Sequence, residues 1–172
     1  MTKLPYHREN LAAAIQQQAR QQLETAGAEQ LSLRQIARFL AVTPAAVYRH
    51  FPDKASLLAA LRADITAELT ATLRENVLDS ADATTMLQHM VRNLLAYADQ
   101  HPQAVAFVLT APLPVPISLT TVVTLYAAQQ GQTAVAPEAG QAVWTFLIGV
   151  LTQYPQDQAT VDWVVAVIER LL

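Results

Sequence analysis

The amino-acid sequence predicts an all-α protein: a three-helix head with a helix-turn-helix arrangement, followed by a C-terminal helical bundle that forms a homodimer. Three observations carry this prediction. Apolar residues recur at helical spacing along most of the 172 residues. Residues that favour helix starts, chiefly Ser, Thr, Asp and Pro, precede several of these segments. The last two segments are apolar on both sides, as expected of helices that are buried on both sides.

The head is expected to begin with a helix over residues 6–25. Leu11, Ile15 and Leu23 share one face of this helix, and Gly27 is a natural stop after it. We place the end of the head at residue 53, so that residues 1–53 form one domain and residues 54–172 form the second.

Two short helices follow within the head. Ser32 and Gln35 form a capping-box pattern, which predicts a helix start at Leu33. After a break, Thr43 is a suitable N-cap, and Pro44 fits the first helical position, where its missing N–H costs nothing. Two short helices joined by a turn of three or four residues form the helix-turn-helix arrangement that reads DNA.

The second domain is expected to contain longer helices. They are predicted over residues 54–78, 83–100, 102–110, 117–130, 137–154 and 158–172. Pro112, Pro114 and Pro116 alternate within residues 111–118. Proline at these positions excludes regular helix, so this segment is expected to be an extended connector.

A symmetric dimer is the economical way to bury the last two helices, because two helices from each subunit then form a four-helix bundle. The alternative is a monomer that holds both helices in its own core. For the dimer, the candidate interface residues are Phe146, Leu147, Val150, Val161, Val164, Val165 and Ile168.

Charge is distributed unevenly along the chain, although the net charge is only −3. Residues 1–62 contain eight Lys and Arg against four acidic residues, and the remainder contains three Arg against ten acidic residues. A basic end attached to an acidic body is typical of a protein that binds nucleic acid.

Composition argues against several other classes of protein. There is no cysteine, which excludes a disulfide framework and a thiolate metal site. The first ten residues are polar and charged, unlike a signal peptide, and no run of eighteen apolar residues predicts a membrane span. The chain has no Gly-rich phosphate loop and no HExxH motif, and its four histidines lack ligand spacing. We therefore expect a soluble cytoplasmic protein that is neither an enzyme nor dependent on a metal or cofactor.

One stretch carries a specific resemblance. In register, it contains Ile36-Ala37, Val42-Thr43, Tyr48-Arg49-His50-Phe51, Asp53-Lys54 and Leu57-Leu58. With these motifs, residues 6–58 resemble the DNA-binding module of the TetR family of bacterial transcriptional repressors. Two small residues depart from the family pattern: Ala41 replaces the usual turn Gly, and Ala45 replaces a frequent Gly of the second short helix.

The resemblance implies that the second short helix lies in the major groove of DNA. Its groove-facing residues would be Thr43, Pro44, Ala45 and Ala46. Arg34 is the best candidate for a bidentate contact to guanine. Positions that contact phosphate are matched by Ser32, Tyr48, His50 and Lys54, and Arg49 is a further candidate for the DNA backbone. The alternative for Tyr48 and His50 is local packing or helix capping.

The resemblance further implies a repressor that binds a palindromic operator in double-stranded DNA as a dimer. A small, largely apolar effector would release it from the operator. Candidate pocket residues, each of which would otherwise be ordinary core, are Met90, Tyr97, Phe107, Tyr126 and Trp144. The alternative function is that of a dimeric helical module that binds protein and has no sequence-specific DNA binding.

Overall fold

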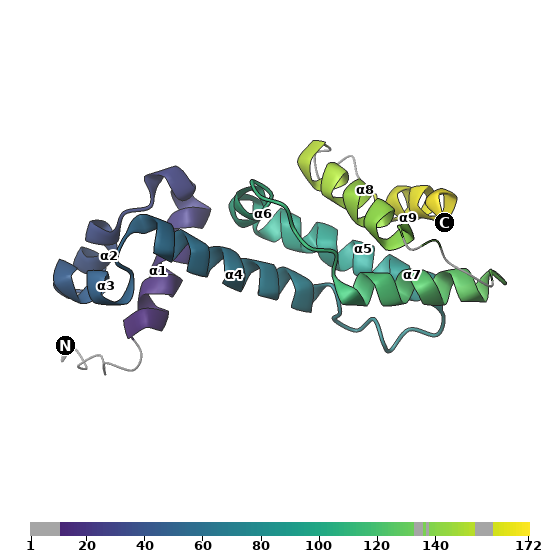
Figure 1. The fold of residues 1–172 in the computed structure, drawn as a ribbon, viewed down its shortest axis with the longest axis horizontal. Coiled ribbons are helices and arrows are strands. Elements are labelled where there is room, and N and C mark those ends of the chain that lie inside the picture. Colours follow the sequence, from purple (N-terminus) through teal and green to yellow (C-terminus); the bar gives the residue numbers. More distant parts are fainter. Residues whose placement is uncertain (1–10, 133–135, 137, 154–159) are drawn as a thin grey trace. The chain divides into compact units, whose positions relative to one another are not determined.

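The computed structural model describes residues 11–132, 136, 138–153 and 160–172, and the regular structure in these ranges is helical (Figure 1). The helices are α1 (Leu11–Ala26), the 3₁₀ helix η2 (Ala28–Gln30), α2 (Leu33–Phe39), α3 (Pro44–His50), α4 (Lys54–Thr72), α5 (Ala83–Gln100), α6 (Pro102–Val108), α7 (Ile117–Gln129), α8 (Ala139–Gln153) and α9 (Val161–Leu171). The predicted all-α class is therefore confirmed.

The chain forms two compact units, Met1–Ile65 and Thr66–Leu172. The division falls within α4, later than the boundary that we expected after Asp53. The N-terminal half of α4 groups with the head because Leu57 and Leu61 are buried there and because Gln16 Nε2 in α1 donates a hydrogen bond to Asp64 Oδ2 at 2.8 Å.

The head is a three-helix unit in which α1 contacts both α2 and α3. Apolar residues at helical spacing on α1, including Ile15, Ala19 and Leu23, are completely buried. Ile36 in α2 and Val47 in α3 are also completely buried. These few contacts orient the two short helices, which are too short to be stable by themselves.

The second unit is organised around α5, which contacts α6, α7 and α9. Helix α8 packs against α7 and α9. Leu87 and Leu94 of α5 belong to the same apolar core as Trp144 of α8 and Ile168 of α9. The indole Nε1 of Trp144 donates to the carbonyl oxygen of Leu113 at 3.2 Å, which ties the proline-rich connector to the core.

Helix α4 ends at Thr72, although the apolar pattern predicted a helix to Leu78. Asn76 has a φ of 56°, a left-handed conformation that a helix cannot contain and that Asn tolerates better than most residues. The side-chain amide of Asn93 in α5 donates to the carbonyl oxygens of Thr72 and Glu75 at 3.0 and 2.9 Å. The carbonyl of Thr72 also accepts from the backbone N–H of Glu75 at 3.1 Å, so a tight turn and the Asn93 amide together close the end of α4.

The other helices follow the predicted ranges with small differences. Helices α2, α3 and α5 begin at the predicted residues, whereas α6 ends at Val108, two residues before the predicted end. The connector was predicted over residues 111–118: residues 111–116 contain no helix, as expected, whereas Ile117 and Ser118 already belong to α7. The predicted helix starts at Tyr6, Pro137 and Gln158 lie outside the described residues.

Candidate nucleic-acid interface

Side-chain caps fix the starts of the two short helices in the head. Ser32 Oγ accepts a hydrogen bond from the backbone N–H of Gln35 at 3.4 Å. Thr43 Oγ1 accepts one from the backbone N–H of Ala46 at 3.2 Å, and Pro44 occupies the first turn of α3. Both helix starts agree with the prediction from sequence, because capping depends on residues within one turn of the helix start. The capping box is only half formed, since the N–H of Ser32 donates to Oε1 of Gln22 at 3.2 Å and not to Gln35.

The turn between α2 and α3 has a defined backbone geometry. The N–H of Val42 donates to the carbonyl of Ala37 at 3.0 Å, and the N–H of Ala41 donates to the carbonyl of Arg38 at 3.2 Å. This pair of bonds is a Schellman motif, in which the residue after the helix adopts a left-handed conformation. Ala41 occupies that position with a φ of 54°. Alanine therefore adopts here a left-handed conformation that glycine would adopt at a lower steric cost.

The two opposite faces of α3 differ in their exposure to solvent. Val47 is completely buried against the head, whereas the groove-facing candidates lie on the outside. Seven of the ten candidate DNA-binding residues are exposed: Arg34, Thr43, Pro44, Ala45, Tyr48, Arg49 and His50. The other three, Ser32, Ala46 and Lys54, are half-buried. The structure thus leaves most of the candidate surface accessible, and the roles of these residues in DNA binding stay predictions.

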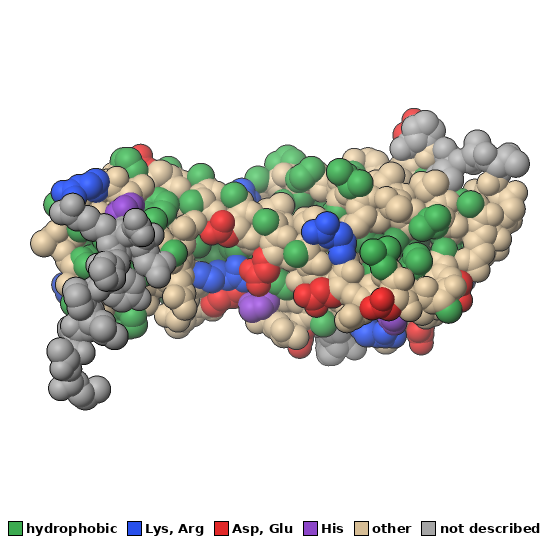
Figure 2. Space-filling view, turned by 90° about the horizontal axis from the view of Figure 1, so that it is seen from below, with side chains coloured by type: hydrophobic (Ala, Val, Ile, Leu, Met, Phe, Trp, Pro, Cys, Tyr) green, Lys and Arg blue, Asp and Glu red, His purple; other side chains and the backbone are tan. Residues whose placement is uncertain are grey.

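The basic side chains of this surface are mostly free to pair with phosphate. The guanidinium groups of Arg34, Arg38 and Arg49 have no ion-pair partner among the residues that the structure describes. On the face drawn in Figure 2, Lys, Arg and His side chains occur at the head and also over the second unit, where most of the acidic side chains lie. Guanidinium forms bidentate bonds with phosphate or guanine, so this surface is suited to DNA.

Lys54 differs from these arginines because its ammonium group already has a partner. Lys54 Nζ donates to the carbonyl oxygen of Glu29 at 2.7 Å, which ties the start of α4 to η2. An ammonium group has three donors, so two remain for a DNA phosphate. Lys54 therefore combines a structural role with its expected phosphate contact.

Phe39, at the C-terminal end of α2, was not among the predicted site residues. Its side chain is 69% exposed, and it lies directly before the turn that leads to α3. Sequence offered one signal: the apolar face of α2 passes through Leu33, Ile36 and Ala37, and Phe39 lies off that face. An exposed aromatic ring beside the turn adds apolar contact area to the candidate surface.

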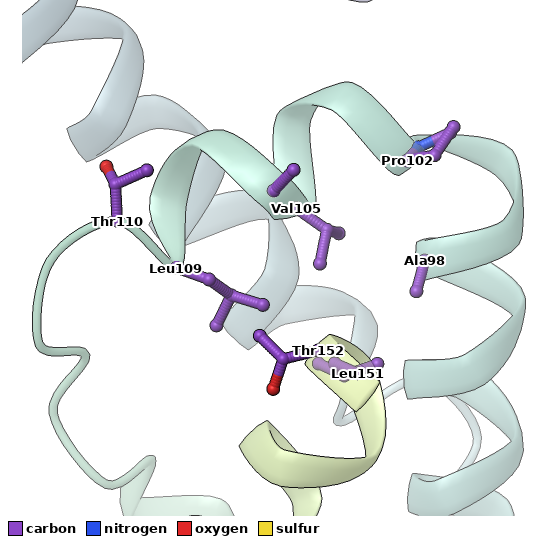
Figure 3. Close-up of a pocket in the computed structure, with 8 residues that line it drawn as sticks. Ala98, Pro102, Val105, Leu109, Thr110, Leu151 and Thr152 are labelled. Atoms are coloured by element: carbon purple, nitrogen blue, oxygen red, sulfur yellow. The ribbon is translucent and has the colours of Figure 1, made fainter. Parts of the chain in front are cut away.

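The five candidate pocket residues, Met90, Tyr97, Phe107, Tyr126 and Trp144, are all buried. Burial and the nearby carboxylate of Glu169 raise the pKa of Tyr126 above its usual value. None of the five lines the cavity of about 390 Å³ that opens between α5, α6 and α8 (Figure 3). A role for them in ligand binding remains a prediction.

The seven candidate dimer residues divide into two groups. Leu147, Val150, Val164, Val165 and Ile168 are buried within the protomer, whereas Phe146 and Val161 are half-buried. The first five cannot form a surface in this packing, because α8 packs against α7 and α9 and because α9 packs against α5. The sequence pattern identified the two helices, but it could not distinguish the side of each helix that is buried in its own protomer from the side that a partner subunit could cover.

Exposed large apolar side chains nevertheless remain on α9, next to the half-buried Phe146 of α8. Trp163 is 37% exposed, and Leu171 is exposed further along the same helix. The rings of Phe146 and Trp163 pack with their centroids 6.0 Å apart, which joins α8 and α9 on this outer side. We call this outer surface, formed by Phe146, Trp163 and Leu171, the α8–α9 outer face.

Two kinds of structural feature are absent from the residues that the structure describes. No helix among them is long and apolar enough to cross a membrane. In the same part of the chain, no group of three or more His, Cys, Asp or Glu side chains is arranged to hold a metal ion.

Comparison with known proteins gives a family match and several structural likenesses. Residues 15–61 match the family described as bacterial regulatory proteins, tetR family. The chain is 30% identical over 93 residues to the nucleoid occlusion factor SlmA of Alteromonas mediterranea, a match that covers 54% of this chain and 48% of that protein. The chain thus spans about half the length of the curated relatives that it matches.

Solved structures share the fold over almost the whole chain. The TetR family transcriptional regulator PfmR of Thermus thermophilus has a TM-score of 0.58 at 19% identity, covering 92% of this chain and 96% of that one. AibR in complex with isovaleryl coenzyme A and operator DNA has a TM-score of 0.63 at 18% identity, covering 95% and 97%. At these identities the likeness establishes the fold, and the head alone carries the family match.

Proposed function

Because residues 15–61 belong to the N-terminal DNA-binding domain of the tetR family of bacterial regulatory proteins, we propose that this chain is a transcriptional regulator that binds operator DNA. The observation that carries the proposal is the outer face of α2 and α3, which is exposed and carries Arg34 and Arg49 without ion-pair partners among the described residues. The family consists of regulatory proteins rather than enzymes. As a DNA-binding regulator, the protein acts in the cytoplasm.

Helix α3 enters the major groove in this proposal. Thr43, Pro44, Ala45 and Ala46 face the groove at the start of α3, where small side chains let the helix approach the base edges closely. Pro44 and Ala45 offer apolar contact, for example to a thymine methyl group. Arg34, at the start of α2, reads guanine through a bidentate pair.

Contacts to the DNA backbone orient this reading head. Ser32, Tyr48, His50 and Lys54 bind phosphate oxygens through hydroxyl, phenol, imidazole and ammonium groups, and Arg49 adds a fifth contact. Such contacts are insensitive to sequence and depend strongly on salt, because each neutralised phosphate releases condensed counterions. Since one head reads few bases, two heads are needed for a specific site.

A homodimer supplies the second head. The α8–α9 outer face shares Phe146 with the predicted interface and adds Trp163 and Leu171, which are exposed in the protomer. A two-fold dimer binds two half-sites roughly 34–36 Å apart, or a multiple of that spacing, so its operator is palindromic. Repression follows when the bound dimer blocks transcription, and this is the mode that we propose.

A small effector releases the dimer from its operator. In support of this proposal, AibR, which shares the fold, has been solved in complex with isovaleryl coenzyme A and operator DNA, so this fold can hold a small molecule and DNA together. Release requires the effector to bind more tightly to a conformation whose heads no longer match the operator.

Selection of bound sequences from a random DNA pool at two salt concentrations tests the proposal. A palindrome that is enriched at low salt and weakened at high salt supports a dimeric regulator. No enrichment at either salt concentration, from protein shown to be free of bound small molecules, would favour the alternative of a helical module that binds protein.

A further inference from the structure

A cavity of about 390 Å³ lies in the second unit, where the C-terminal ends of α5 and α8 meet α6. We call it the α6 pocket. Figure 3 shows side chains that converge on it from all three helices. Its lining residues are Ala98, Pro102, Val105, Ala106, Leu109, Thr110, Leu151 and Thr152. All of them belong to the same compact unit.

No charged side chain lines the α6 pocket, and both of its hydroxyl groups donate their protons to backbone carbonyls. Thr152 Oγ1 donates to the carbonyl of Ile148 at 2.6 Å, and Thr110 Oγ1 donates to the carbonyl of Phe107 at 2.7 Å. The remaining lining side chains are Ala, Pro, Val and Leu. The lining side chains therefore offer an incoming ligand neither a cation nor a hydrogen-bond donor.

This lining discriminates by charge. An anionic group that leaves water for the pocket loses its hydration and finds no donor or cation in return, which is strongly unfavourable. A neutral apolar molecule loses little on entry and gains contact with methyl and methylene groups from three helices. A carboxylate, phosphate or sulfonate group that lies inside the pocket is therefore strongly disfavoured.

The volume of the pocket indicates that its ligand is a small molecule and not a protein partner. A cavity of roughly 150 Å³ accommodates benzene, so 390 Å³ suits a molecule of about 15 non-hydrogen atoms. A specific protein–protein interface buries about 1,200–2,000 Å² of surface, which a pocket of this size cannot supply.

We propose that the α6 pocket binds a neutral, largely apolar small molecule the size of a substituted naphthalene, and that this molecule is the class of effector to which the regulator responds. Ligand binding in the α6 pocket does not depend on the proposed function, whereas the role of this ligand as an effector rests on it. Since the ligand spans α5, α6 and α8, its binding changes the packing of these three helices, and such a change is what an effector needs to favour one conformation.

Two fluorescent probes with the same skeleton test the charge selectivity. N-phenyl-1-naphthylamine is neutral, and 8-anilino-1-naphthalenesulfonate carries an added sulfonate. Titration of the full-length protein should show saturable binding of the neutral probe, at least about tenfold tighter than that of the sulfonate. Equal affinity for the two probes, or no saturable binding of the neutral one, would overturn the proposal.

Filling the pocket tests the location. Ala106→Phe adds a phenyl group at an exposed lining position, so it should weaken binding of the neutral probe by about tenfold or more while the protein stays folded. Thr110→Phe, at another exposed lining position, should act in the same way. The matched control is Ala96→Phe, on an exposed site of α5 outside the pocket. Unchanged binding in both filled variants, with folding verified by circular dichroism, would place the probe elsewhere and overturn the assignment.

An experiment with operator DNA distinguishes a failure of this proposal from a failure of the proposed function. The neutral probe should dissociate the wild-type protein from its selected operator, and it should fail to do so with Ala106→Phe. If the protein selects no operator, the proposed function fails while the binding result stands. If the protein binds both operator and probe but the probe causes no release, the effector role is wrong.

Discussion

At Ala41, the turn of the head holds an L-residue in a conformation that favours glycine. Its φ of 54° brings the Cβ close to the following carbonyl, which costs roughly 1–2 kcal/mol relative to the right-handed region. Ala41→Gly removes this strain, and part of the gain is offset by the greater freedom of glycine in the unfolded chain. We expect a net stabilisation of about 1 kcal/mol in chemical denaturation.

The same substitution elsewhere in the head should act in the opposite direction. Ala59 is exposed within α4, where glycine is less favourable than alanine by about 1 kcal/mol. Ala59→Gly should therefore destabilise the protein. A destabilised Ala41→Gly variant would show that the turn does not adopt the left-handed conformation in solution.

Arg34 carries the sharpest residue-scale prediction for DNA binding. A bidentate contact to guanine contributes about 1–3 kcal/mol of discrimination, so Arg34→Ala should weaken operator binding by roughly tenfold or more and relax sequence preference at one position of each half-site. Fluorescence anisotropy with the selected operator measures the first effect, and repeated selection measures the second.

Arg92→Ala is the matched control, because Arg92 is an exposed arginine of α5 and its loss changes the net charge equally. It should leave the affinity almost unchanged. Arg49→Ala should weaken binding to all sequences alike and should reduce the salt slope by about 1, as for a phosphate contact. Equal effects of Arg34→Ala and Arg92→Ala would contradict the assignment of Arg34.

Among the elements, α5 has an N-terminus that depends on a carboxylate. Asp82 Oδ1 accepts a hydrogen bond from the backbone N–H of Thr85 at 2.8 Å. The backbone and side-chain hydrogen bonds from Thr85 lower the pKa of Asp82 below its usual value. A lowered pKa means that the unfolded chain binds the proton more readily, so the cap contributes stability above the ordinary pKa of Asp. That contribution disappears as the pH falls through the lowered value.

Thermal unfolding across the acidic range below about pH 4 tests this cap. Asp82→Asn keeps a capping oxygen but cannot be protonated in this range, so its melting temperature should fall less with acid than that of the wild type. Asp99→Asn removes the same charge at the other end of α5 and serves as the control. Parallel acid curves for the wild type and Asp82→Asn would contradict a role for the Asp82 carboxylate.

The helices also show which of their termini could be predicted from the sequence. The starts of α2, α3 and α5 were predictable because Ser32, Thr43 and Asp82 act within one turn of their own helices. The end of α4 was not, because it depends on a left-handed Asn76 and on Asn93, which comes from another helix. A terminus set by a distant side chain leaves no local pattern to read.

The candidate functional side chains also fall into two groups: those that local sequence predicts and those whose surroundings depend on distant residues. Arg34 and Tyr48 belong to a motif with a fixed register, so the sequence predicted that they lie on one surface; both are exposed, and their role in DNA binding stays a prediction. The predicted interface residues Val164 and Ile168 were apolar at helical spacing, but the structure buries them in their own protomer. The α6 pocket escaped prediction because it is formed by small residues such as Ala98 and Ala106, whose importance is the space that they leave.

For the molecule as a whole, the proposed dimerisation through the α8–α9 outer face would decide whether a specific operator is bound. Trp163 is 37% exposed in the protomer and contacts Phe146, so its burial in a dimer would contribute substantially to association. Trp163→Glu places a charge in this surface, where an unpaired carboxylate cannot be buried at low cost. We expect monomers in analytical ultracentrifugation at concentrations at which the wild type is dimeric.

Loss of the dimer should then weaken operator binding far more than any single contact does. A monomer has one head, so it should bind a half-site and the full palindrome with similar, low affinity, whereas the wild type should strongly prefer the palindrome. Leu78→Glu is the control, because Leu78 is 87% exposed and lies outside α8 and α9. If Trp163→Glu remains dimeric and binds the palindrome as the wild type does, the subunits associate through another surface. If it is monomeric but still prefers the palindrome, pairing of the heads on DNA depends on contacts within the heads.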